Sequence, residues 1–104
     1  MEIKCFTNKD KNSLLIKVSG ECDLYNARDF FNGIAGKIYH GCYNRAIVDL
    51  SALAYLDSSG VGAIIRIIKL AKEKQTILSF RGINGMTRKV LDMCNILSLI
   101  VEDQ

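Results

Sequence analysis

The residues best suited to chemistry stand together in the stretch YLDSSGVGAII, positions 55–65. Two adjacent serines, Ser58 and Ser59, follow Asp57 and precede a Gly-x-Gly sequence. A serine in this setting could cap a helix, attack a substrate as a nucleophile, or accept a phosphate. Because each role needs different surroundings, the rest of the sequence has to distinguish them.

A nucleophilic serine needs a base within hydrogen-bond reach. His40 is the only histidine, and it lies in KIYHGC at the expected end of a helix, where the dipole favours an imidazole. The Gly-x-Ser-x-Gly elbow of serine hydrolases is absent, because Leu56 and Asp57 stand where that motif would need glycine. The sequence therefore argues against a serine hydrolase.

The sequence also lacks a nucleotide-binding motif. Gly60 and Gly62 form a lone Gly-x-Gly, since Ile65 stands where a third glycine would be needed, and no Gly-Lys-Ser/Thr occurs. Asp49 and Asp57 offer two carboxylates for acid–base chemistry, but their spacing alone does not place them together. We therefore expect neither an enzyme nor a cofactor.

The composition fits one domain over residues 1–104, in a reducing cytoplasm. The net charge is only +3 and the basic residues are scattered, which argues against nucleic-acid binding. The four cysteines form no Cys-x-x-Cys pair, so we expect buried free thiols and no metal site. Arg66 and Lys69 interrupt the longest apolar stretch, so we expect no membrane partner.

Hydrophobic periodicity predicts the element order β-β-α-β-α-β-α-β. The strands are expected at 3–6, 14–19, 45–50, 76–80 and 98–101, and the helices at 27–39, from 59 or 60 to 74, and 85–94. Asn26 and Asn84 are the expected caps of the first and third helices, and the third should face inward through Met86, Val90, Leu91 and Cys94. This α/β alternation predicts a mixed sheet with an N-terminal hairpin, parallel after it and packed against helices.

The serine pair follows the strand predicted at 45–50, at the end of a parallel strand where sites collect. Asp57, Ser58 and Ser59 are all cap-type residues, yet a helix that begins near Gly60 needs only one cap. A phosphate just ahead of a helix is tolerated, because the dipole and the free N–H groups favour negative charge. The residues alone leave both capping and modification open.

Three stretches of the chain resemble one known family. VDLSALAYLDSSGVGAII resembles the signature of the bacterial anti-sigma-factor antagonists, the STAS-domain proteins. VSGECDLYNA resembles the segment before their first helix, and RGINGMTRKVLDMCNILSLI resembles their closing helix and strand. These stretches span nearly the whole chain in the family's order, so a STAS fold is expected.

The resemblance implies a partner-switching phosphoprotein. Such proteins bind an anti-sigma factor that is also a serine kinase, and so free a sigma factor for transcription. The kinase phosphorylates the serine after the aspartate, here Ser58, and a phosphatase reverses this. The implied partner-binding loop comprises Asp23, Asp57, Ser58, Ser59 and Gly60. In it, Asp57 would shape the loop, Ser59 would cap the helix, and Gly60 would admit the kinase to the backbone.

A second interpretation keeps the STAS fold but changes its use. The chain would then be an interaction or scaffold subunit of a stress-signalling or lipid-transport complex. Under either interpretation we expect a monomer or a weak dimer.

Overall fold

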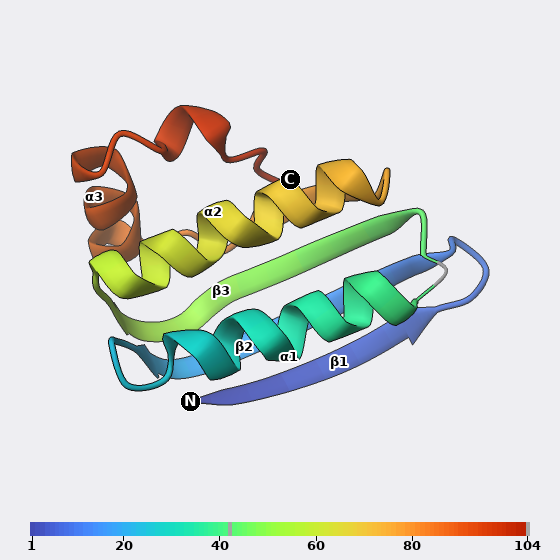
Figure 1. Cartoon of the computed structure of the whole chain (residues 1–104), viewed down its shortest axis with the longest axis horizontal. Helices are drawn as coiled ribbons and strands as arrows, with labels where there is room; N and C mark the ends of the chain where they lie inside the picture. Colours follow the sequence, from blue (N-terminus) through green and yellow to red (C-terminus); the bar gives the residue numbers. More distant parts are fainter. Residues whose placement is uncertain (42, 104) are drawn as a thin grey trace.

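Four strands form one mixed sheet in the computed structural model, which describes residues 1–41 and 43–103 (Figure 1). They lie in the order β1-β2-β3-β4, with bounds β1 Glu2–Asn8, β2 Ser13–Cys22, β3 Arg45–Leu56 and β4 Ile77–Arg81. The β1–β2 pair is an antiparallel hairpin, whereas β2–β3 and β3–β4 are parallel. The structure thus confirms the predicted mixed α/β sheet.

Two helices, α1 (Ala27–His40) and α2 (Ser58–Glu73), pack on one face of this sheet and against each other. The core lies between these layers, and its largest buried side chains include Phe30, Ile64 and Phe80. Figure 1 shows that both helices begin at the same end of the molecule, where β3 delivers the chain into α2. The packing therefore brings the loops ahead of α1 and α2 to one edge.

The strand β3 runs to Leu56, beyond its predicted end at residue 50. The cause lies in β2, which has register irregularities on either side of Gly20 and continues to Cys22. It pairs Glu21 with Tyr55 and Cys22 with Leu56. Half of the segment at 53–60, which was predicted to follow the strand as a loop, is therefore strand. Only Asp57 remains between β3 and α2.

The helix α3 (Gly85–Met93) faces the core through a narrower stripe than predicted. It buries Thr87 and Leu91, one helical turn apart. Met86 and Cys94, which were predicted to point inward, are exposed. The helix is short and contacts mainly β3 and the chain that follows it. Val90, also predicted to point inward, is half-buried and packs against the core.

The prediction of a last strand at 98–101 is wrong, because none of these residues forms a strand and only Glu102 makes a bridge to β4. Asn95 has φ 60° and turns the chain at the end of α3, and a 3-10 helix η1 (Leu97–Leu99) follows. The chain then reaches β4 as a single parallel bridge between Phe80 and Glu102. The final segment lies beside β4 as a rudimentary fifth strand.

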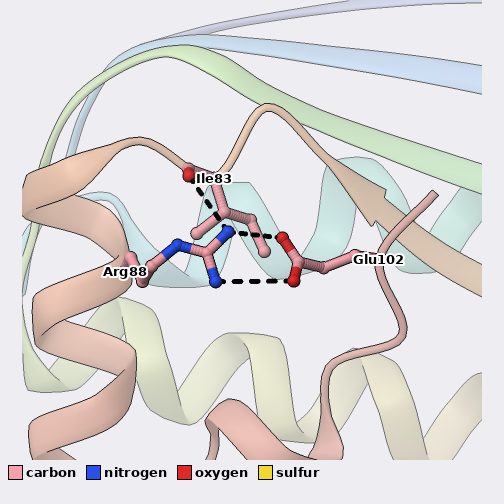
Figure 2. A network of polar contacts seen from close by, with 3 residues as sticks. All are labelled: Ile83, Arg88 and Glu102. Carbon is pink, nitrogen blue, oxygen red and sulfur yellow. Dashed lines mark hydrogen bonds and ion pairs between the residues drawn. The ribbon is translucent and has the colours of Figure 1, made fainter. Parts of the chain in front are cut away.

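Arg88 anchors this final segment to α3. Its guanidinium pairs with both carboxylate oxygens of Glu102, at 2.5 and 3.4 Å, and donates to the carbonyl oxygen of Ile83 at 3.4 Å (Figure 2). A second ion pair joins Arg81 to Asp103 at 2.7 Å. The two pairs hold the chain end against the edge of the sheet.

Two glycines provide a matched test of the backbone. Gly82 has φ +70°, and a Cβ there would lie 2.6 Å from the Cβ of Ser51, whereas a Cβ on Gly62 within α2 would meet nothing. We expect Gly82→Ala to lower the free energy of unfolding by about 2 kcal/mol and Gly62→Ala to raise it by about 0.5 kcal/mol. Urea denaturation measures both, and a Gly82→Ala protein as stable as wild type would contradict the left-handed turn.

Candidate functional site

One carboxylate, that of Asp57, organises the turn between β3 and α2. Its Oδ1 accepts the backbone N–H groups of Ser59 at 2.9 Å and Gly60 at 3.2 Å, which caps α2. Its Oδ2 accepts the N–H of Leu24 at 3.2 Å, from the loop ahead of α1. Asp57 thus joins the two loops that the sequence placed at one surface.

The prediction that Ser59 caps α2 is wrong. The helix begins at Ser58, one or two residues earlier than expected, so Asp57 occupies the N-cap position. Ser59 is then the second helical residue and donates its backbone N–H to the cap. Asp57 shapes the loop, as predicted, and it does so by capping the helix.

The loop ahead of α1 is closed by its own side chains. Asp23 Oδ1 accepts the N–H groups of Tyr25 at 2.9 Å and Asn26 at 3.2 Å. The Asn26 side chain in turn accepts the N–H of Asp23 at 2.9 Å and donates to the carbonyl oxygen of Glu21 at 2.7 Å. Asn26 stands at the N-cap position of α1, but its side chain caps no helical N–H, which corrects its predicted role.

Ser58 is exposed at the first position of α2. Its hydroxyl takes part in none of the side-chain hydrogen bonds found within residues 1–41 and 43–103. The neighbouring Ser59 is half-buried. Within the described residues the Ser59 hydroxyl also makes no side-chain hydrogen bond, so greater exposure is what opens Ser58 to a partner.

Gly60 is buried and serves internal packing. A Cβ at this position would lie 2.9 Å from the Sγ of Cys22 and would also clash with Leu56. The close approach that glycine permits here is therefore between α2 and the end of β2. It replaces the predicted approach of a kinase to the backbone.

Cys22 lies beneath this site as a neutral thiol. Burial, together with the negative charges of Asp57 and Asp23, raises its pKa to about 11. The prediction of a buried thiol is confirmed for Cys22 and wrong for Cys94, which is exposed, while Cys42 lies outside the described residues. Within the part of the chain that the structure describes, no three His, Cys, Asp or Glu side chains gather as metal ligands.

The other residues considered for chemistry lie elsewhere. Asp49 precedes Asp57 by eight residues, about 26 Å along a strand, so the two carboxylates do not form an acid–base pair. His40 is the last residue of α1, about 21 Å from the helix start that lies near Ser58. The structure therefore brings Asp23, Asp57 and Ser58 together and leaves the candidate base apart.

The family model of the STAS domain matches residues 6–103. The chain therefore belongs to the STAS-domain family, which confirms the resemblance seen in its sequence. In the described ranges, no helix combines the length and the apolar character that crossing a bilayer requires.

Solved structures with the same fold include several bacterial proteins. The anti-sigma factor antagonist SpoIIAA in its unphosphorylated form is 17% identical, with 99% of this chain and 89% of that chain covered and a TM-score of 0.79. SpoIIAA of Bacillus in the phosphorylated form is also 17% identical, with 99% of this chain and 92% of that chain covered and a TM-score of 0.71. A sulfate transporter family protein from Wolinella succinogenes is 15% identical, with 91% of this chain and 75% of that chain covered and a TM-score of 0.74. At these identities the likeness shows the STAS fold.

Substitutions at the turn test which residue caps α2. We expect Asp57→Ala to lower the free energy of unfolding by about 1–2 kcal/mol, because two helical N–H groups lose their acceptor. Ser59→Ala, the matched control, should change it by less than about 0.5 kcal/mol. Asp57→Asn should fall between them, since one amide oxygen can still cap α2 but the amide nitrogen cannot accept from Leu24. Urea denaturation gives the ranking, and equal losses in Ser59→Ala and Asp57→Ala would contradict it.

The raised pKa of Cys22 predicts alkaline sensitivity. Below about pH 9 the thiol is protonated in both the folded and the unfolded chain, so its stabilising contribution is fully present. Between pH 9 and 11 the unfolded chain releases the proton first, so the free energy of unfolding falls as the pH rises. We expect wild type to lose more stability across this range than Cys22→Ala. Thermal denaturation measures both proteins, and an equal loss of stability in wild type and Cys22→Ala would contradict the raised pKa of the thiol.

Proposed function

We propose that this chain is a phosphorylation-switched anti-sigma-factor antagonist. Its unphosphorylated form binds an anti-sigma serine kinase and so frees a sigma factor. Phosphorylation of Ser58 ends that binding, and a serine phosphatase restores it. The observation that carries the proposal is the exposed, unengaged hydroxyl of Ser58 beside a helix cap made by Asp57.

This arrangement lets Ser58 accept a phosphate without loss of the fold. The cap depends on the Asp57 carboxylate and on backbone N–H groups, none of which belongs to the Ser58 side chain. The positive end of the α2 dipole offsets part of the added charge of roughly −1.5 to −2. SpoIIAA is similar in fold to this chain in both its unphosphorylated and its phosphorylated form, which supports a modification that leaves the fold intact.

The proposed switch needs no catalytic group on this chain. The kinase supplies the phosphoryl-transfer machinery, and the antagonist presents a hydroxyl and a docking surface. We propose accordingly that the chain is no enzyme and acts in the cytoplasm as a monomer or weak dimer. The phosphate opposes docking by its bulk, its hydration and its charge.

The test uses a purified anti-sigma serine kinase from the same organism, with ATP and mass spectrometry. Wild type and Ser59→Ala should each gain one phosphate on Ser58, and Ser58→Ala should gain none. In binding assays Ser58→Ala should match wild type, and Ser58→Asp should bind at least about tenfold more weakly, because the added charge must be desolvated at the interface. A Ser58→Asp protein that binds as tightly as wild type would refute the charge switch.

A second candidate function is a STAS interaction or scaffold subunit of a larger complex. The likeness to a sulfate transporter family protein favours it, because that fold occurs outside the antagonists. The same experiment separates the two. Tight binding to another subunit, with no phosphate on Ser58 in the presence of the kinase, would support the scaffold role.

A further inference from the structure

Two large apolar side chains stand in solvent beside Ser58. Leu24 is 70% exposed and Tyr25 is 92% exposed, the highest value among the large hydrophobic residues of the described ranges. The N–H of Leu24 donates to Asp57, the residue directly before Ser58, so the backbone that carries both side chains lies next to the Asp57–Ser58 turn. Since burying a leucine contributes about 1.5–3 kcal/mol, the isolated fold gains nothing from this exposure.

The backbone that carries these side chains is fixed. Leu24 donates to the Asp57 carboxylate at 3.2 Å, and Tyr25 donates to the Asp23 carboxylate at 2.9 Å. The Asn26 side chain closes the loop, because it accepts the N–H of Asp23 and donates to the carbonyl oxygen of Glu21. Contacts on a preorganised loop lose less conformational entropy on binding than contacts on a mobile one.

We infer that Leu24 and Tyr25 are the apolar anchor by which this chain holds its kinase next to Ser58. The inference rests on the proposed function. The matching surface on the kinase is an apolar pocket at the edge of its active site, large enough for one aliphatic and one aromatic side chain. Tyrosine is among the residues that most often dominate interface energetics, and its two side-chain torsions lose little entropy.

The anchor also explains how one phosphate can release the partner. Docking Leu24 and Tyr25 removes water from the surface around the Asp57–Ser58 turn. An unmodified hydroxyl tolerates this, whereas a phosphate loses its hydration when the apolar contact closes over it. Apolar contact and phosphorylation thus oppose each other at one surface.

The experiment uses the serine kinase that phosphorylates the wild-type chain on Ser58. We expect Tyr25→Ala to weaken binding about 30-fold and Leu24→Ser about fivefold, with a raised KM and an unchanged kcat for phosphorylation. Tyr25→Phe should stay within about threefold of wild type, because the ring supplies the contact. The matched control is Tyr39→Ala, an exposed tyrosine near the far end of α1. The Leu24 and Tyr25 variants keep their backbone N–H groups, so their urea midpoints should remain those of wild type.

The outcomes separate this inference from the proposed function. If wild type is phosphorylated on Ser58 while Tyr25→Ala and Leu24→Ser bind normally, the anchor is refuted and the switch stands. If the kinases of the organism neither bind nor phosphorylate wild type, both fail. If Tyr25→Ala dissociates a dimer in sedimentation and leaves kinase binding intact, the loop contacts a second copy and the anchor is refuted.

Discussion

The candidate site depends on three hydrogen bonds to one carboxylate. Asp57 accepts two N–H groups at the start of α2 and one from the loop ahead of α1. Packing on the sheet sets the directions of the two helices, but it does not fix the loops that precede them. Asp57 supplies that constraint, because its two oxygens serve different elements. It also relieves Ser58 and Ser59 of the capping role.

The position of Asp57 is itself set by the sheet. The extension of β2 to Cys22 lets the carbonyl oxygen of Cys22 accept the N–H of Asp57 at 3.2 Å. Gly60, one turn into α2, lies against the same cysteine, where no larger residue fits. The backbone N–H of Asp57 and the first turn of α2 thus both contact Cys22. A substitution at Cys22 would therefore displace the Asp57 turn and, with it, Ser58.

The sequence predicted the alternation of strands and helices correctly, because the apolar spacing of both helices on the sheet is strong. The extension of β3 was missed because Ser51, Ala52 and Ala54 do not give the alternation of apolar and polar residues that marks a strand. The pairing that makes this segment a strand comes from β2, more than 30 positions earlier. Long-range pairing of this kind leaves no local pattern in the sequence.

The cap illustrates the same limit at one site. Asp57, Ser58 and Ser59 all suit an N-cap, so residue type could not choose among them. The end of β3 determines which of them caps α2, because it places Asp57 in extended conformation directly before the helix. The contact from Leu24 to Asp57 also had no signal in the sequence, as it joins residues 33 positions apart. The sequence indicated residues that the structure brings together at this turn, but it could not assign the helix cap among them.

That division has an energetic consequence for the proposed switch. Burying the Leu24 and Tyr25 side chains in a partner contributes about 1.5–3 kcal/mol each. Desolvating a charged group without a partner costs several kcal/mol, and a phosphate carries close to two charges. One modification on a hydroxyl that the fold does not use can therefore offset both apolar contacts. Were Ser58 the helix cap, the same phosphate would also disturb α2, and binding could not be switched independently of stability.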